Sequence, residues 1–196
     1  MRHTLGLLGT ALVLLVGSPM FWDALAADAR GPDSPPAHAR ERGERDCSSA
    51  FYWEQPECPL PALVALDDIQ AVTGVDTIPP IDEPRFESVS AAGQWLSPES
   101  PLLVVSVGGE TRGYPLAILT WHEIVNDEIA GTPVVVTYCP LCNSGLVFER
   151  RVDGEVLTFG TSGHLFRSNL VMYDRQHRNF WLQFTGRAVA GERFAG

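Results

Sequence analysis

The sequence predicts an α+β fold rich in β-structure: a single compact domain of mainly antiparallel strands with one or two short helices. Three observations lead to this prediction. From Pro101 onward, short apolar runs rich in β-branched and aromatic residues follow one another. Turn signals separate these runs, notably Gly108-Gly109 and Asp153-Gly154, which are typical of tight hairpins. Helical signals occupy only two short stretches of this region.

Six segments are expected to form strands, because each is a short apolar or alternating run that ends near a turn signal. Upstream of them, residues 60–74 are expected to hold a short helix. Residues 77–86 contain too many prolines for a regular element and are expected to be extended coil. The expected strands span residues 102–107, 133–138, 144–151, 156–159, 169–173 and 180–184.

Two short helices are expected between the first two strands. One is a short helical stretch that follows Pro115. The other, of about two turns, is expected to begin at Trp121, because Thr120 and Glu123 fit the capping-box pattern of a helix N-terminus. This second helix is expected to end near Asp127.

The first 26 residues have the three regions of a secretory signal peptide. Arg2 precedes an uncharged apolar run over residues 5–17, and Ala24-Leu25-Ala26 is a small-x-small site for signal peptidase. The alternative is an uncleaved anchor, because residues 5–22 carry no charge and reach the lower limit for crossing a bilayer. That alternative predicts membrane association through the N-terminal segment. Both place the rest of the chain outside the cytoplasm, as a periplasmic, secreted or membrane-anchored protein.

The chain is expected to contain three further parts. Residues 27–46 are rich in proline, glycine and mixed charge, which is typical of a flexible, disordered linker. Residues 47–76 are expected to form a small N-terminal lobe stapled by a disulfide between Cys47 and Cys58, which an oxidising compartment favours. The main domain is expected over residues 77–196. Its pattern stops without a capping element, so we expect the C-terminus to be truncated.

Charge and composition exclude several classes of function. The formal net charge is −10, which argues against nucleic acid as a partner. All fourteen basic residues are arginine, so the chain has no lysine for a Schiff base, a phosphate loop or general base catalysis. No nucleotide cofactor is therefore expected.

Cys139 and Cys142 form a C-P-L-C turn between two expected strands, and four roles stay open for them. The leading hypothesis is a metal knuckle, with His122 and Met172 completing a site for a soft metal such as copper or zinc. The alternative is a thiol–disulfide oxidoreductase, although that chemistry usually places its first thiol at a helix N-terminus. A nucleophile activated by His122 and a structural module whose cysteines only brace the turn complete the set.

The other polar residues of the main domain are weaker candidates. His164 follows Gly160-Thr161-Ser162-Gly163, which is expected to be a β-turn that could aim the imidazole inward. His177 lies in a charged run and is expected to be a solvated turn residue. Four further residues could bind an acidic small molecule or form only a surface charge network: Arg167, Asn169, Asp174 and Arg175.

Five motifs occur in order along the main domain: Tyr114-Pro115-Leu116, Trp121-His122-Glu123-Ile124-Val125-Asn126-Asp127, Thr137-Tyr138-Cys139-Pro140-Leu141-Cys142, Phe159-Gly160-Thr161-Ser162-Gly163 and Leu170-Val171-Met172-Tyr173-Asp174-Arg175. Together they resemble the bacterial and archaeal domain-of-unknown-function family number 3179, over residues 77–191. The resemblance implies an exported or membrane-associated protein and supplies no mechanism. It implies that the family's motif positions include His122, Cys139, Cys142, Met172 and Asp174, but not His164 or His177. It also implies that the family domain continues beyond residue 196.

Overall fold

The structure of the protein is a computed structural model that describes residues 62–191. The expected signal peptide or anchor, the linker and the Cys47–Cys58 disulfide lie outside these residues. Within the described part the fold is α+β and rich in β-structure, with mainly antiparallel sheets and two short α-helices, as predicted. No helix in residues 62–191 is long and apolar enough to cross a membrane.

The largest sheet has five antiparallel strands in the order β1-β9-β10-β11-β12. Its first strand precedes residue 77, the expected start of the main domain, so part of the expected N-terminal lobe belongs to this sheet. A bulge between Val171 and Met172 shifts the pairing of β9 with β10. The strands are β1 (Ile69–Ala71), β9 (Phe159–Phe166), β10 (Asn169–Asp174), β11 (Phe180–Leu182) and β12 (Arg187–Ala190).

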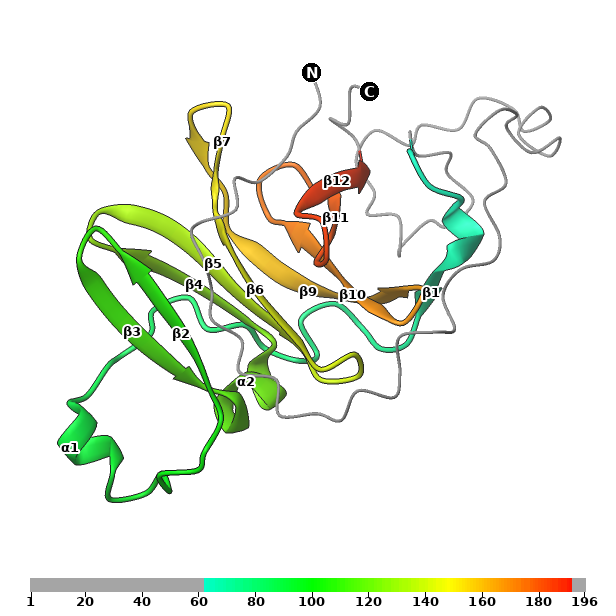
Figure 1. The fold of residues 1–196 in the computed structure, drawn as a ribbon. Helices are drawn as coiled ribbons and strands as arrows, with labels where there is room; N and C mark the ends of the chain where they lie inside the picture. The colour runs from blue at the N-terminus through cyan, green and yellow to red at the C-terminus, as the bar shows by residue number, and fades with distance from the viewer. Residues whose placement is uncertain (1–61, 192–196) are drawn as a thin grey trace, which may run out of the picture. The chain divides into compact units, whose positions relative to one another are not determined.

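A three-stranded antiparallel sheet, in the order β4-β5-β6, occupies the middle of the fold. Two hairpins make up the remaining β-structure (Figure 1). One consists of two longer strands, and the other is a short hairpin that follows β6. The middle strands are β4 (Ile124–Ile129), β5 (Thr132–Cys139) and β6 (Ser144–Glu149). The hairpins are β2 (Leu102–Val107) with β3 (Glu110–Pro115), and β7 (Arg151–Val152) with β8 (Glu155–Val156).

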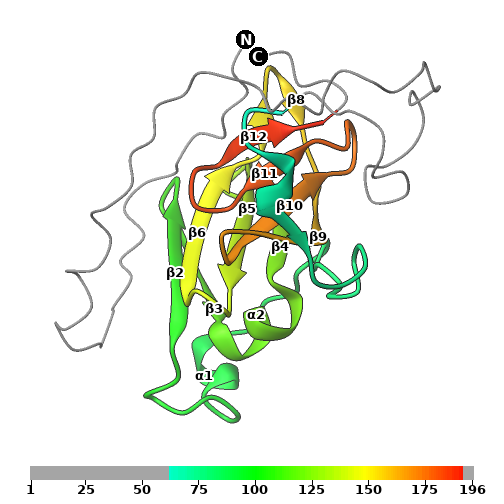
Figure 2. The ribbon, with the colours of Figure 1, turned by 90° about the vertical axis from the view of Figure 1, so that its right-hand side faces the viewer.

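The central strand β5 separates two apolar cores, because its side chains alternate between the two faces of the sheet. Val135 and Cys139 pack into a core shared with β9, β10, β11 and β12. Val134, Val136 and Tyr138 pack into a second core, shared with the β2–β3 hairpin and the helix after it. The β2–β3 hairpin and the five-stranded sheet therefore cover opposite faces of the middle sheet (Figures 1 and 2).

Three helical segments occur in the described residues: a 3₁₀-helix (Leu66–Asp68), α1 (Val89–Ala92) and α2 (Leu116–His122). The helical stretch expected after Pro115 is confirmed as α2. The expected short helix within residues 60–74 is reduced to the single 3₁₀ turn, which leads directly into β1.

The prediction of a helix from Trp121 to Asp127 is wrong. The helix ends at His122, Glu123 adopts a positive φ of 58°, and β4 begins at the next residue. The Thr120 hydroxyl donates to the Leu116 carbonyl inside α2 instead of capping a new helix. Pairing with β5 buries both faces of β4, and this tertiary gain outweighs the local capping signal.

The expected turn at Gly160-Thr161-Ser162-Gly163 is also wrong, because these residues lie within β9. Ser162 is fully buried, and its hydroxyl donates to the Val171 carbonyl at 2.6 Å. Gly163 has a φ of 74°, and a Cβ there would collide with the Thr73 carbonyl. The glycine therefore permits close backbone approach within a strand, not a reversal of the chain.

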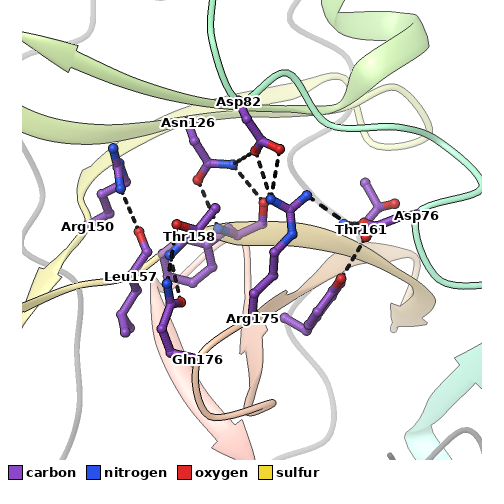
Figure 3. Close-up of polar contacts among 11 residues, drawn as sticks. Asp76, Asp82, Asn126, Arg150, Leu157, Thr158, Thr161, Arg175 and Gln176 are labelled. Carbon is purple, nitrogen blue, oxygen red and sulfur yellow. Dashed lines mark hydrogen bonds and ion pairs between the residues drawn. The ribbon is translucent and has the colours of Figure 1, made fainter.

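A polar network ties the coil before α1 to the strands (Figure 3). One nitrogen of Arg175 donates to both oxygens of Asp82, at 2.9 and 2.8 Å. Asp76 accepts hydrogen bonds from the Tyr173 hydroxyl and the Thr161 amide, at 2.7 and 3.1 Å. For Arg175, the structure therefore supplies the charge network that was one of the two sequence interpretations.

Candidate functional site

Cys139 and Cys142 flank the turn that joins β5 to β6. Cys139 ends β5, where it pairs with Ser144 of β6, and is buried; Cys142 is half-buried. Both are free thiols. Asn143 closes the turn with a φ of 47°, a conformation that asparagine tolerates, and its side-chain oxygen accepts a hydrogen bond from the Tyr138 hydroxyl at 2.8 Å. The pair thus sits on a short, well-supported hairpin end.

Two polar side chains contact the Cys142 sulfur. The Ser144 hydroxyl lies 3.1 Å from Sγ, and the Asn169 amide nitrogen donates to Sγ at 3.4 Å. Asn169 comes from the start of β10, in the other sheet, and is itself buried. The sulfur therefore lies where the middle sheet meets the five-stranded sheet.

Hydrogen bonding fixes which end of the Asn169 amide faces the sulfur. The backbone N–H of Phe184 can only donate, and it donates to the Asn169 Oδ1 at 3.1 Å. The Nδ2 group therefore points the other way, with one hydrogen directed at the Gln183 Oε1, 2.7 Å distant, and one at the Cys142 Sγ. An N–H donor directed at sulfur stabilises the thiolate over the thiol.

Gln183 holds this arrangement in place and has no exposed surface. Its Nε2 donates to the Ser144 carbonyl and to the Thr137 hydroxyl, at 2.9 and 3.2 Å. Its Oε1 accepts from the Ser144 hydroxyl and from the Asn169 amide. All the hydrogen-bonding positions of this buried amide are filled, so it is a rigid support for the groups around Cys142.

The two thiols differ in environment. Burial, together with a hydrogen bond to Cys142, raises the pKa of the Cys139 thiol to about 11. Its Sγ also lies 3.9 Å from the Ser168 carbonyl, a weak interaction that again favours the protonated form. Cys139 is therefore a thiol at neutral pH, and Cys142 is the more accessible sulfur, with the donors around it.

Three of the four residues of the expected metal site meet at one apolar core, and the fourth, His122, is not part of that core. Met172 is fully buried in the same apolar core as Cys139, with Cys142 packed against that core. His122 ends α2, and its Nδ1 lies 2.7 Å from the Pro79 carbonyl. In residues 62–191, no group of three or more His, Cys, Asp or Glu side chains is placed to hold a metal ion. The four-ligand geometry of a structural zinc site thus has no support in the described part of the chain.

The other two histidines within residues 62–191, His164 and His177, have structural partners. The His164 ring is buried, its Nδ1 lies 2.7 Å from the Ser162 carbonyl, and it packs on Phe180. Burial lowers the pKa of His164, so the ring is mainly neutral at pH 7. His177 was expected to be solvated, but its Nε2 lies 2.7 Å from a Glu155 carboxylate oxygen and its side chain is only 19% exposed.

Sequence reasoning missed two residues around Cys142. The Ser144 hydroxyl contacts the sulfur, and Gln183 holds Ser144 and Asn169 in place. A signal for the second was present, because Gln183 is an amide within the apolar run Phe180-Trp181-Leu182 to Phe184. A polar residue at such a position needs buried partners. Asn169 was singled out, but as a candidate for anion binding and not as a donor to sulfur.

Glu123 lies beside His122, and burial raises its pKa to about 7 from an ordinary value of 4.5. Since the folded state then holds this proton more tightly than the unfolded state, the associated stability is complete below about pH 4.5 and is lost as pH rises through 7. Glu123→Gln is expected to remove this slope, worth about 1 kcal/mol after discounting for solvent screening. Urea unfolding at pH 5 and pH 8 measures it, and an unchanged slope in the variant would refute the assignment.

The model of the family described as "Protein of unknown function (DUF3179)" matches residues 75–194. The chain belongs to this family. The DUF3179 match includes both cysteines, Asn169 and Gln183, and it agrees with the resemblance seen in the motifs. No curated protein and no solved structure matches the chain.

Proposed function

We propose that Cys139 and Cys142 form a thiol–disulfide exchange centre in which Cys142 is the attacking thiol. The observation that carries the proposal is the Asn169 amide hydrogen held against the Cys142 sulfur. Exchange requires a thiolate nucleophile, and an N–H donor to sulfur lowers the free energy of that form. The order of roles is the reverse of that in thioredoxin-like sites, where the first cysteine of the pair attacks.

Ser144 can supply a second hydrogen bond to the thiolate that attack requires. Its hydroxyl hydrogen is directed at Gln183, so in the neutral state the Ser144 oxygen is free to accept from the Cys142 S–H at 3.1 Å, and the Cys139 carbonyl is the other acceptor within reach, at 3.9 Å. When the thiol loses its proton, the Ser144 hydroxyl can rotate and donate to Sγ instead. Gln183 keeps its hydrogen bond from Asn169 in both states. The thiolate would then have two donors without any movement of the backbone.

The exchange proceeds in two balanced steps. The Cys142 thiolate attacks one sulfur of a substrate disulfide, a new S–S bond forms, and the other substrate sulfur leaves as a thiolate that takes up a proton. The Cys139 thiol then gives up its proton to solvent and attacks the Cys142 Sγ, which leaves a Cys139–Cys142 disulfide and releases the second substrate sulfur as a thiolate that takes up a proton from solvent. The substrate gains two electrons and the protein loses two. The reverse sequence oxidises a substrate dithiol.

Cys139 suits the resolving role. It is buried, so a bulky substrate disulfide cannot approach it, and its raised pKa keeps it a thiol until Cys142 has reacted. With the expected signal or anchor, this centre would act on exported proteins, in a compartment where disulfides form and persist.

The proposal predicts that the two thiols of the reduced protein differ in reactivity. At pH 7, iodoacetamide is expected to modify Cys142 more than about tenfold faster than Cys139, because the thiolate is the reactive form and Cys139 is both buried and protonated. Peptide-level mass spectrometry over a time course measures both sites and separates them from Cys47 and Cys58.

Asn169→Ala supplies the discriminating variant, since it removes the donor and leaves both cysteines. Its alkylation at Cys142 is expected to fall about fivefold at pH 7, because the sulfur loses its N–H donor. Asn143→Gly removes an amide in the same turn, and glycine tolerates the φ of 47° at this position. Among the described residues this amide interacts with the Tyr138 hydroxyl and not with sulfur, so the variant should leave the rate unchanged. Equal slowing in both variants, or faster reaction at Cys139, would overturn the assignment of Cys142 as nucleophile.

A second candidate function is the binding of a soft metal ion by the same two sulfurs. Met172 favours it, since its thioether lies in the core that contains Cys139 and Cys142. Soft ligands of this kind suit copper(I) better than zinc, which would need further ligands. Copper binding would require Cys139 to lose its proton, so affinity should rise with pH. Copper(I) titration of the parent and Cys142→Ser proteins against a chromophoric chelator tests it: equal competition in both would exclude this site.

A further inference from the structure

A second feature of the molecule lies away from the cysteines, where the chain makes a loop of about twenty residues before β2. This loop carries α1, and Figures 1 and 2 show it as a projection at one end of the fold, next to β2 and β3. An open groove of about 1030 Å³ lies between the loop and β3. The size is at the upper end of the range for binding sites in proteins.

The loop exposes large apolar side chains that its own fold does not cover. Phe86, Val89 and Trp95 are 46%, 91% and 54% exposed, and all three line the groove. Leu102 of β2 and Ile118 of α2, also exposed, line it too. Isolated exposed hydrophobic residues are ordinary, but a contiguous set around a groove indicates a binding surface.

Two of the large polar side chains in the groove, Arg112 and Trp95, are already engaged. Arg112 is paired with Asp127 and Glu110, and it lies 4.6 Å above the Phe86 ring. The Trp95 indole donates to Glu87. The interior of the groove is therefore suited to apolar side chains of a ligand, and not to groups that need hydrogen bonds from protein side chains.

The edge of β3 offers backbone hydrogen bonds in their place. Among the described residues, β3 is paired with β2 alone. Gly108 and Gly109 both have positive φ, as in a two-residue hairpin turn, so Val107 and Glu110 form the first hydrogen-bonded pair. By alternation, Thr111 and Gly113 direct their N–H and C=O groups away from β2. Both residues line the groove.

The charged side chains that line the groove favour a ligand with a particular charge on either side of its apolar part. Three carboxylates, Glu83, Glu87 and Glu110, line the groove with two guanidinium groups, and one of these, Arg112, is neutralised by the buried Asp127. The surplus is negative. A ligand with positive charge beside its apolar part complements it.

We infer that this groove binds an extended polypeptide segment whose alternating apolar side chains are flanked by lysine or arginine, and that the segment pairs with the free edge of β3. Strand addition of this kind takes affinity from backbone hydrogen bonds and specificity from pockets for alternate side chains. The inference does not depend on the exchange chemistry at Cys142.

The test is fluorescence anisotropy with the full chain and a labelled ten-residue peptide, in which alternating Val and Ser residues are flanked by Arg pairs. We expect saturable binding, weakened about tenfold by Trp95→Ala, because an aromatic anchor at a groove contributes at this level. Trp121→Ala is the matched control: Trp121 is 76% exposed and does not line the groove, so its loss should leave binding unchanged. A Cys139→Ala/Cys142→Ala protein should also bind as the parent does.

Two modified peptides test the mode of binding. Each peptide carries N-methyl groups on alternate residues, so that only one edge of its strand is blocked, and the two peptides differ in which edge that is. The peptide blocked on the edge that faces β3 should bind at least tenfold more weakly than the unmodified peptide. Replacement of the Arg flanks by Glu should also weaken binding. Equal affinity of both methylated peptides and the parent peptide would overturn the inference. If the peptide did not bind, two other results would also overturn the inference. One is a protein dimer that depends on Trp95, detected by sedimentation, and the other is flotation with phosphatidylcholine vesicles that depends on Trp95.

Discussion

Cys142→Ala is expected to lower the rate of reaction with an aromatic disulfide by more than about a hundredfold, because the remaining thiol of the pair is buried and protonated. Cys139→Ala is expected to keep the first step within about threefold of the parent rate. Without a resolving thiol, however, that variant should stop at a stable mixed disulfide on Cys142. The coloured thiolate released by the reagent gives the rate, and mass spectrometry locates the adduct.

The two variants must differ in this direction for the assignment of roles to stand. A stable adduct on Cys139 in Cys142→Ala, formed at the parent rate, would reverse the roles. If both single variants kept the parent rate, the reaction would come from Cys47 or Cys58, and the adduct would be found there. Circular dichroism of both variants checks that the β5–β6 hairpin still folds, since Cys139 is part of the apolar core.

Five of the expected strands were predictable because their signal is repeated along each segment: β2, β5, β6, β10 and β11. The strand expected over residues 156–159 is wrong, because β8 ends at Val156 and β9 begins at Phe159. In β5, a run of β-branched residues ending at Cys139 predicts a buried strand, and the structure buries it on both faces. The helix expected from Trp121 rested instead on one local cap pattern. Thr120 and Glu123 fit that pattern, but the pairing of β4 with β5, which joins Ile124 to Thr137, depends on a strand beyond the next turn, which a local pattern does not report.

The sequence predicts the two reactive cysteines of the candidate site, but it does not predict the side chains that hydrogen-bond around them. The two cysteines of the C-P-L-C turn can be recognised from the sequence alone. His122 was grouped with them on chemical type alone, and the structure places its imidazole against the Pro79 carbonyl. Asn169 reaches Cys142, and Gln183 reaches the neighbouring Ser144 and Thr137, only because β10 and the segment after β11 pack against the end of β5. Their role therefore follows from the way two sheets meet.

Gln183→Leu is expected to destabilise the protein by about 3 kcal/mol. The side chains are similar in size, but leucine leaves the Ser144 hydroxyl, the Ser144 carbonyl and the Asn169 amide without the partner that Gln183 supplies, all in a site with little access to water. Gln70→Leu is the matched control, because Gln70 is an exposed residue of β1, and its effect should stay within about 0.5 kcal/mol. Chemical denaturation of the reduced proteins measures both.

The same variant separates a structural role of Gln183 from a role in the chemistry. Without Gln183, the Asn169 amide keeps its hydrogen bond from the Phe184 N–H but loses the 2.7 Å hydrogen bond that holds its Nδ2 group, so its position against the sulfur is less firmly fixed. Alkylation of Cys142 at pH 7, measured in conditions where the variant is fully folded, should therefore slow about fivefold, as in Asn169→Ala. In the double variant, the two effects should not add, because both act through one hydrogen bond. A destabilised Gln183→Leu protein whose Cys142 reacts at the parent rate would show that the network supports the fold alone.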